Sequence, residues 1–314
     1  MKIEVVGRAG PEGWPADGCR CASCGRARAA GVRWEPTRVM IDGVALAECP
    51  RLDVAGGWDV RVPSGHRVLV AGGVGQRPEP AAGVVYDAAL LDLVGSPEHL
   101  GWLRRAGAVS EATDVRAVYV DHRVASPAEF ERRMGFWTRP VEGTHRALVL
   151  GGSRSGKSAE AELRLLARPD VTYVATGVGD PADAEWTARI EAHRERRPSW
   201  WRTVETTDLA RALASADGAV LVDGIGSWVA AAMDETDAWD DPSRVRRKLD
   251  ELVEAWRSTA AYVVAVSDEV GMSLVPTTPV GRAFRDVLGT LNQRLAAESE
   301  EVALVVAGRV LDLP

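Results

Sequence analysis

The chain has 314 residues, of which 46% are hydrophobic, and a formal net charge of −7. This length favours two domains over one core. The negative charge argues against a nucleic acid or an anionic membrane as partner, because the field of the whole chain would attract neither. The longest apolar runs have the length of strands, which predicts a soluble protein without membrane insertion.

The N-terminal residues 1–7 predict a strand and a turn. They lack the charged, apolar and small-residue regions of a secretion signal, so we expect a cytoplasmic location.

All four cysteines lie within the first 50 residues, and Cys19, Cys21 and Cys24 form a Cys-x-Cys-x-x-Cys pattern. In a cytosolic chain this pattern favours a metal or redox cluster over disulfides. A structural Zn²⁺ would need a fourth ligand, from Cys49 or from a histidine such as His122. Free or partly buried thiols are the alternative.

Residues 1–145 form the first of the two expected domains. They are rich in Gly and Pro, and short apolar runs alternate with turn signals. This pattern predicts strands at 39–46, 58–62, 67–71 and 115–120, and a helix around 99–106.

A glycine-rich loop of the form Gly-x4-Gly-Lys-Ser begins the second expected domain, residues 146–314. A short apolar strand leads into it and a helix-like segment follows. Such a loop wraps backbone N–H groups around a polyphosphate; Lys157 would reach the β- and γ-phosphates, and Ser158 would hold Mg²⁺. The sequence therefore predicts a site for a nucleoside triphosphate, with a chance glycine-rich turn as the alternative. The loop comprises Gly151, Gly152, Ser153, Arg154, Ser155, Gly156, Lys157 and Ser158.

The rest of the second domain alternates strands and helices, which is typical of an α/β fold with a mostly parallel sheet flanked by helices. Ligands of such sheets bind at the carboxyl ends of the strands, so the loop and the strand ends should share one rim. The strands are expected at 171–175, 219–223, 262–267 and 302–306, and the helices at 208–216, 242–260 and 281–298.

Asp223 ends the apolar run Ala-Val-Leu-Val-Asp. A carboxylate at a strand end beside a phosphate loop is typical of the acidic residue that faces Mg²⁺. The alternative is an ordinary aspartate that caps a turn.

A basic constellation follows at residues 188–198, where Arg189, His193 and Arg197 recur at four-residue steps and would share one helix face. Neighbouring positive charge keeps an imidazole neutral, so His193 could attack phosphorus while the arginines hold phosphate oxygens. A helix with a solvated basic face is the competing interpretation.

Five motifs in order give residues 146–314 a specific resemblance. They are Leu-Gly-Gly-Ser-Arg-Ser-Gly-Lys-Ser, Tyr-Val-Ala-Thr, Arg-Ile-x-x-His-Arg-x-x-Arg-Pro, Ser-Asp-Glu-Val-Gly-Met-Ser and Phe-Arg-Asp-x-x-Gly-x-x-Asn-Gln-Arg. This region resembles the bifunctional adenosylcobinamide kinase/adenosylcobinamide-phosphate guanylyltransferase family of cobalamin biosynthesis. It differs from many members at Asp268, where they carry asparagine.

The resemblance implies a two-step enzyme. ATP or GTP would phosphorylate adenosylcobinamide, and GTP would then give GMP to that phosphate through a guanylylated His193. It also implies a homotrimer and a sheet with one antiparallel edge strand, with residues 302–313 as its final hairpin. The implied nucleotide contacts beyond the phosphate loop are Val174, Ala175, Thr176, Arg194, Glu195, Arg196, Arg197, Glu205 and Asp223.

Residues 1–50 are similar to the opening of metallo-β-lactamase-fold phosphodiesterases, which often carry a cysteine loop. The hydrolytic signature His-x-His-x-Asp-His of that fold is absent. Because a two-metal hydrolase needs several clustered ligands, we expect residues 1–145 to be a shortened, catalytically silent relative.

Two rival functions remain at this stage. A regulatory or binding NTPase would use the phosphate loop but not His193. A metal-dependent hydrolase would be centred on residues 1–145 and would need two metals, for which the histidine pairs are missing.

Overall fold

The computed structural model describes residues 1–72, 76–139, 141, 143–177, 191 and 194–314. The described residues divide into two compact units. The first comprises Met1–Pro140 and Leu166–Pro169, and the second comprises Val141–Leu165 and Asp170–Pro314. The two domains inferred from the sequence stay a prediction, because no measurement of independent folding bears on them.

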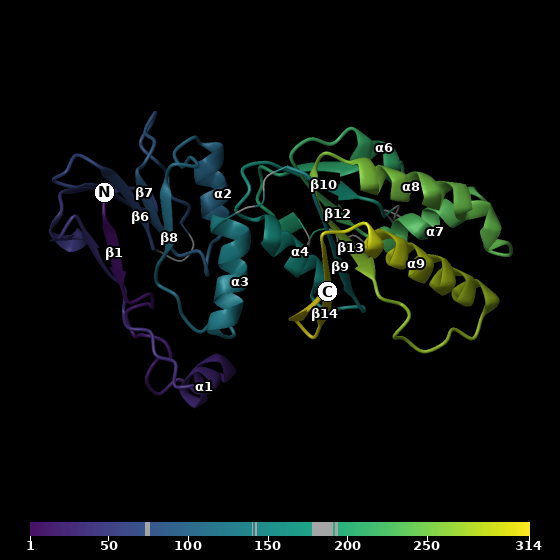
Figure 1. Ribbon diagram of the computed structural model, residues 1–314, viewed down its shortest axis with the longest axis horizontal. Helices are drawn as coiled ribbons and strands as arrows, with labels where there is room; N and C mark the ends of the chain where they lie inside the picture. The colour runs from purple at the N-terminus through teal and green to yellow at the C-terminus, as the bar shows by residue number, and fades with distance from the viewer. Residues whose placement is uncertain (73–75, 140, 142, 178–190, 192–193) are drawn as a thin grey trace. The chain divides into compact units, whose positions relative to one another are not determined.

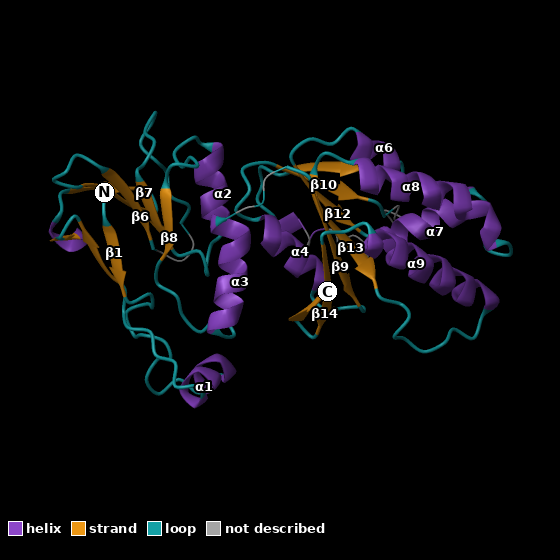
Figure 2. Ribbon diagram, viewed as in Figure 1, coloured by secondary structure: helices purple, strands orange, loops and turns teal. Residues whose placement is uncertain are grey.

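The described residues of the first unit form two small sheets and three α-helices, which Figure 2 colours by type. One sheet is antiparallel, with β1 (Ile3–Val6), β2 (Arg38–Ile41) and β3 (Val44–Ala45). The other has the order β4 (Arg51–Val54), β5 (Gly57–Arg61), β6 (Arg67–Ala71), β7 (Ala88–Leu91) and β8 (Asp114–Ala117). The helices are α1 (Ala22–Ala29), α2 (Glu98–Arg105) and α3 (Pro127–Thr138), and Leu46–Glu48 form a 3₁₀ turn.

Two strands expected in this unit differ in extent. The run 39–46 is a hairpin and not one strand, because Asp42 and Gly43 adopt φ angles of 50° and 83° and reverse the chain between β2 and β3. The run 115–120 leaves the sheet after Ala117, close to Tyr119, whose φ is 60°. A left-handed residue of this kind interrupts an extended strand.

The second unit is built on a seven-stranded sheet with the order β11-β10-β12-β13-β9-β14-β15 (Figure 1). Its strands are β9 (His145–Gly151), β10 (Val171–Ala175), β11 (Arg202–Glu205), β12 (Ala219–Asp223), β13 (Tyr262–Asp268), β14 (Glu301–Val306) and β15 (Arg309–Leu313). All neighbouring pairs are parallel except β14 and β15. The expected mostly parallel sheet with one antiparallel edge strand is therefore confirmed.

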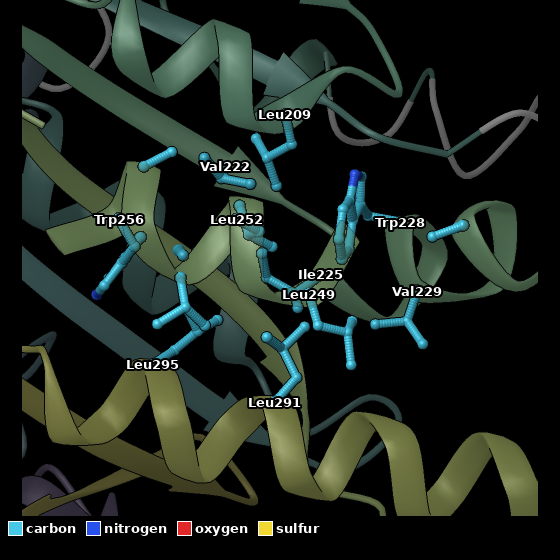
Figure 3. Packing of buried hydrophobic residues seen from close by; sticks show 14 of the residues in the cluster. Leu209, Val222, Ile225, Trp228, Val229, Leu249, Leu252, Trp256, Leu291 and Leu295 are labelled. Atoms are coloured by element: carbon cyan, nitrogen blue, oxygen red, sulfur yellow. The ribbon is translucent and has the colours of Figure 1, made fainter. Parts of the chain in front are cut away.

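Helices cover the sheet of the second unit (Figure 2). They are α4 (Lys157–Leu165), α6 (Leu209–Ala214), α7 (Ile225–Glu235), α8 (Arg246–Ser258) and α9 (Pro279–Ala297), with a 3₁₀ turn at Pro242–Val245. Leucines, valines and tryptophans from α6 to α9 pack on one face of β9, β12 and β13 (Figure 3).

Side-chain alternation divides the two faces of this sheet. Val174 and Val222 belong to the apolar core that α6 to α9 cover. Because successive strand residues point to opposite faces, Tyr173 and Asp223 point to the other face, which α4 covers. The alternation therefore brings two polar strand residues to the side on which the phosphate loop continues into α4.

The Arg146–Glu300 pair joins β9 to the start of β14 in the second unit. The Arg146 backbone N–H and guanidinium both donate to the Glu300 carboxylate, with the backbone bond at 2.7 Å. These bonds lower the pKa of Glu300 from 4.5 to about 2. A carboxyl group whose pKa is lower in the folded state stabilises the fold at pH values above its unfolded-state pKa. This contribution is lost as the pH falls through its folded-state pKa.

We therefore expect Glu300→Gln to destabilise the chain by about 1 kcal/mol at pH 7, because the pair is partly exposed. The difference should shrink between pH 4.5 and pH 2. Urea unfolding of both proteins across this range tests it, and a difference that stays constant with pH would contradict the assignment.

Candidate functional site

The phosphate loop connects β9 to α4. β9 ends at Gly151 and α4 begins at Lys157. A Cβ on Gly151 would approach the Val305 carbonyl oxygen to 2.8 Å, and Gly156 has a φ of 99°. The loop therefore needs glycine at both positions, one for space and one for backbone conformation.

Lys157 projects over this loop. Its Nζ donates to the Gly152 carbonyl oxygen at 3.1 Å and lies 2.8 Å from Asp268 Oδ1 at the end of β13. β13 is the direct neighbour of β9, so the sheet itself brings the lysine and the aspartate together. The phosphate loop and the carboxyl end of β13 therefore share one rim of the sheet, as expected.

Ser158, at the start of α4, and Asp223, at the end of β12, also meet at this rim. Ser158 Oγ lies 3.3 Å from Asp223 Oδ1, and the Tyr173 hydroxyl donates to Asp223 Oδ2 at 2.7 Å. A hydroxyl and a carboxylate that converge beside a phosphate loop are the oxygen ligands that Mg²⁺ takes together with substrate phosphates. The residues present therefore fit this ion.

Two arginines of the predicted basic segment are anchored next to α4 and β10. Arg196 binds the Glu162 carboxylate through two N–H bonds of 3.0 and 3.1 Å, and Glu162 is buried on α4. Arg197 lies over the Tyr173 ring, with Cζ 3.4 Å from the ring centroid. These contacts hold the end of the basic segment close to the residues that follow the phosphate loop.

Arg194 and Glu205 are more exposed than this pair. Arg194 Nη2 lies 3.9 Å from Glu205 Oε1, and their side chains are 62% and 72% exposed. Glu205 ends β11, so it shares the carboxyl rim of the sheet. Its carboxylate is therefore accessible to a ligand at that rim. His193 and Arg189, the other members of the basic constellation, lie outside the described residues.

The expected contact segment 174–176 follows β10. Val174 is buried in the core, and the fully buried Thr176 donates its hydroxyl to the Gly224 carbonyl oxygen at 2.6 Å. Thr176 therefore ties the end of β10 to the start of α7. Its role as a nucleotide contact stays a prediction.

Sequence reasoning gave no role at this site to Tyr173 and Glu162. Each is recognised only by its partner: Asp223 for the tyrosine and Arg196 for the glutamate. The partners lie at least 34 positions away along the chain, so no local spacing signals them.

The first unit contains a separate cluster. One ligand atom each from Cys19, Cys21, Cys24 and His122 lies within 4.8 Å of the others. Cys49 lies elsewhere, in the core below β2 and β5, and its thiol donates to the Ala45 carbonyl oxygen. Of the two fourth ligands that the sequence left open, only His122 belongs to the group.

The three thiols have different surroundings. Cys21 caps α1, and the Cys24 backbone N–H that bonds its sulfur lowers the pKa of Cys21. Burial raises the pKa of Cys24 to about 11. Zn²⁺ binds thiolates and imidazoles in fours, so the chemistry of this donor set fits zinc.

The described part of the first unit offers no second metal site of this kind. Outside the cysteine cluster, no group of three potential ligand atoms converges among the described residues. Asp92, at the end of β7, is instead bound by Arg123, whose Nη2 donates to it at 2.8 Å. An arginine therefore supplies the positive charge beside this carboxylate.

No described helix is both long and apolar enough to cross a membrane.

The chain is similar to known proteins over its second part. Residues 147–313 match the family model described as cobinamide kinase / cobinamide phosphate guanyltransferase. The bifunctional adenosylcobalamin biosynthesis protein CobU of Salmonella typhimurium is 40% identical over 179 residues, which cover 51% of this chain and 95% of that protein. CobU of Escherichia coli is 38% identical, with coverages of 51% and 95%, and CobP of Pseudomonas aeruginosa is 36% identical, with coverages of 54% and 96%. With its phosphate loop, Asp223 and paired arginines inside the matched region, this chain belongs to the cobinamide kinase / cobinamide phosphate guanyltransferase family.

Proposed function

We propose that this chain phosphorylates adenosylcobinamide with a nucleoside triphosphate and then transfers GMP from GTP to that phosphate through His193. The observation that carries the proposal is the meeting of the phosphate loop, Asp223 and the Arg196–Arg197 pair at one rim of the sheet, within the region that matches the family. Each of these groups binds phosphate or its metal in nucleotide enzymes.

In the phosphoryl transfer, an alcohol oxygen of adenosylcobinamide attacks the γ-phosphorus. The new O–P bond replaces the bond to the bridging oxygen, the nucleoside diphosphate leaves, and the hydroxyl proton goes to solvent. The backbone N–H groups of the loop hold the β- and γ-phosphates. Lys157 stabilises the negative charge that develops on the bridging oxygen.

Mg²⁺ is the metal proposed for this site, held by Ser158 and Asp223 together with phosphate oxygens. When bound, it neutralises phosphate charge. Tyr173 keeps the Asp223 carboxylate turned towards Ser158 by donating its hydroxyl to the second oxygen.

In the guanylyl transfer, a neutral imidazole nitrogen of His193 attacks the α-phosphorus of GTP. The N–P bond forms while the bond between the α-phosphorus and its bridging oxygen breaks, and pyrophosphate leaves. The phosphate of cobinamide phosphate then attacks the same phosphorus, the N–P bond breaks, and His193 is free again. Arg194, Glu195, Arg196 and Arg197 follow this histidine directly in the chain.

Glu205 is the proposed partner of the guanine base. Its exposed carboxylate stands at the end of β11, on the same rim as the loop. A carboxylate accepts two parallel N–H bonds, and the guanine edge offers such a pair. Adenine lacks this pair, so Glu205 would favour GTP in the guanylyl transfer.

The proposal is tested with GTP labelled at the α-phosphate. The purified chain is incubated with it, denatured and separated by electrophoresis, and the band is treated with acid and with alkali. An acid-labile, alkali-stable label indicates a histidine adduct. A chain that binds GTP but takes up no label would instead be a kinase or a regulatory NTPase, which is the alternative function.

For the first unit we propose a structural Zn²⁺ on Cys19, Cys21, Cys24 and His122, with no catalytic role. Tetrahedral zinc with bonds of about 2.3 Å holds sulfurs about 3.8 Å apart, so atoms already within 4.8 Å need only a small shift. The metal would fasten the cysteine segment to residues 122–125, where Ser23 and Arg26 already donate to the Val124 and Ala125 carbonyl oxygens.

Zinc analysis of the purified chain should give one ion per chain. We expect His122→Asn to weaken zinc binding at least tenfold, because it removes one of four ligands, while Cys49→Ser should bind like the unaltered chain. Competition with a coloured chelator measures both. Equal losses in the two variants would contradict the ligand set.

We also propose a homotrimer, in line with the family resemblance. Sedimentation equilibrium of the full chain tests it, and a monomer at micromolar concentration would contradict it.

A further inference from the structure

Tyr173 occupies a special place among the buried aromatic residues of the second unit. It lies in the middle of β10, its side chain is on the α4 face of the sheet, and it is 6% exposed. It contacts two side chains of the site: its hydroxyl donates a hydrogen bond to Asp223, and the Arg197 guanidinium lies over its ring. Tyr173 therefore lies between the proposed magnesium side of the site and the basic segment.

The hydroxyl acts as a fixed donor. A phenol ordinarily keeps its proton at neutral pH, because its reference pKa is about 10. A protonated phenol offers one donor, and the carboxylate 2.7 Å away accepts it. The bond leaves the other oxygen of Asp223 for Ser158.

The Tyr173 ring makes a separate contact, with Arg197. A guanidinium 3.4 Å above a ring centroid is in the range of a strong cation–π contact, above all where water is excluded. Arg196, the preceding residue, is fixed to Glu162 on α4. The two neighbouring arginines are therefore held by two different elements, Arg196 by α4 and Arg197 by a contact with the β10 ring.

We infer that Tyr173 is a positioning residue for both halves of the site: its hydroxyl orients Asp223 towards the metal side, and its ring holds Arg197 for binding of the nucleotide phosphates. The inference rests on the proposed function for the ligand, a magnesium–nucleoside triphosphate. It adds a residue that touches neither the metal nor the phosphates and acts through Asp223 and Arg197.

A second buried tyrosine provides a matched control. Tyr262 begins β13 and is also 6% exposed, but its ring stacks on His145 at the opposite end of the strands. A general effect of removing a buried phenol from this sheet would appear equally in Tyr173→Phe and Tyr262→Phe. An effect through Asp223 would appear only in Tyr173→Phe.

The experiment measures binding, so that it does not depend on the histidine adduct. The ligand is GTP with a methylene bridge between the α- and β-phosphorus, which blocks guanylyl transfer. Its dissociation constant is determined by calorimetry with EDTA and with saturating Mg²⁺. The proteins are the unaltered chain, Tyr173→Phe, Tyr173→Leu, Arg197→Ala, the double variant Tyr173→Leu/Arg197→Ala, and Tyr262→Phe.

Tyr173→Phe keeps the ring and loses the hydroxyl. We expect affinity in EDTA to stay within about twofold, while the gain in affinity from Mg²⁺ falls about tenfold, the size of one hydrogen bond to a charged group. Tyr173→Leu loses both contacts, so affinity in EDTA should also fall, about fivefold. The double variant should bind in EDTA no more weakly than Arg197→Ala, because the ring acts through that arginine.

Other results would overturn the inference. An unchanged magnesium effect in Tyr173→Phe removes the role of the hydroxyl, and equal binding of Tyr173→Phe and Tyr173→Leu in EDTA removes the role of the ring. Loss of affinity in Tyr262→Phe to the same degree would indicate a general packing effect. If the unaltered chain binds the nucleotide but takes up no GMP label, the guanylyl transfer fails while the inference on Tyr173 is still decided by these constants.

Discussion

We expect His193→Ala to take up no GMP label and to lose guanylyl transfer by at least about 1,000-fold, because the variant has no atom that can form the N–P bond. Phosphorylation of cobinamide should remain, since that transfer goes directly from the triphosphate to the alcohol and uses the phosphate loop. The measurement is α-label uptake together with chromatographic separation of cobinamide, cobinamide phosphate and cobinamide-GDP.

His66→Ala is the control for this variant. His66 lies in the first unit, where its Nδ1 is 3.4 Å from Asp87 Oδ1, and it belongs to no proposed site. It should label like the unaltered chain. A His193→Ala chain that still labels would place the nucleophile elsewhere and would return the basic segment to a phosphate-binding or surface role.

We expect Arg164→Met to lower the free energy of unfolding by about 3–5 kcal/mol, more than any other single substitution considered for stability. The Arg164 side chain is 1% exposed on α4, and its guanidinium binds Glu160 at 2.9 Å and Glu301 of β14 at 2.7 Å. Removing it takes the guanidinium away from the Glu160 carboxylate, which is 7% exposed. Denaturant unfolding of the full chain measures the loss.

Two further variants separate the causes of this loss. Arg164→Met combined with Glu160→Met should recover part of the stability, because it also removes the buried carboxylate, and only Glu301, which is 39% exposed, then loses a contact with Arg164. Arg257→Met removes an arginine that is 53% exposed and should cost about 1 kcal/mol or less. A small effect of Arg164→Met would mean that Glu160 is solvated or protonated in the folded chain.

The sequence predicted the second unit better than the first. The runs 171–175 and 219–223 are strands to the residue, because buried parallel strands are continuous apolar runs bounded by polar residues. In the first unit the hairpin within 39–46 was missed, although Asp42 and Gly43 form an Asp-Gly pair, which is a strong turn signal between two alternating runs. The strand β7 (Ala88–Leu91) and the helix α7 were not predicted either.

At the candidate site, residues of a contiguous motif could be predicted from the sequence, whereas contacts between residues far apart in the chain could not. The phosphate loop is a local pattern of eight residues, so its glycines and Lys157 can be recognised without a structure. Tyr173 reads in the sequence as one more apolar strand residue. Its meaning depends on Asp223, which is 50 positions away and comes into reach only when β10 and β12 pair in register.

Lys157, the lysine that we propose to bind phosphate, has a counter-ion within the chain, the carboxylate of Asp268. An incoming phosphate must compete with a carboxylate 2.8 Å from Nζ, and the carboxylate it displaces is left next to added negative charge. A ligand with little charge gains less than it costs to break this pair, whereas a triphosphate with its metal brings both a stronger acceptor and a cation. In the proposed phosphoryl transfer, Asp268 would thus favour entry of the triphosphate over the nucleoside diphosphate and would help this product to leave.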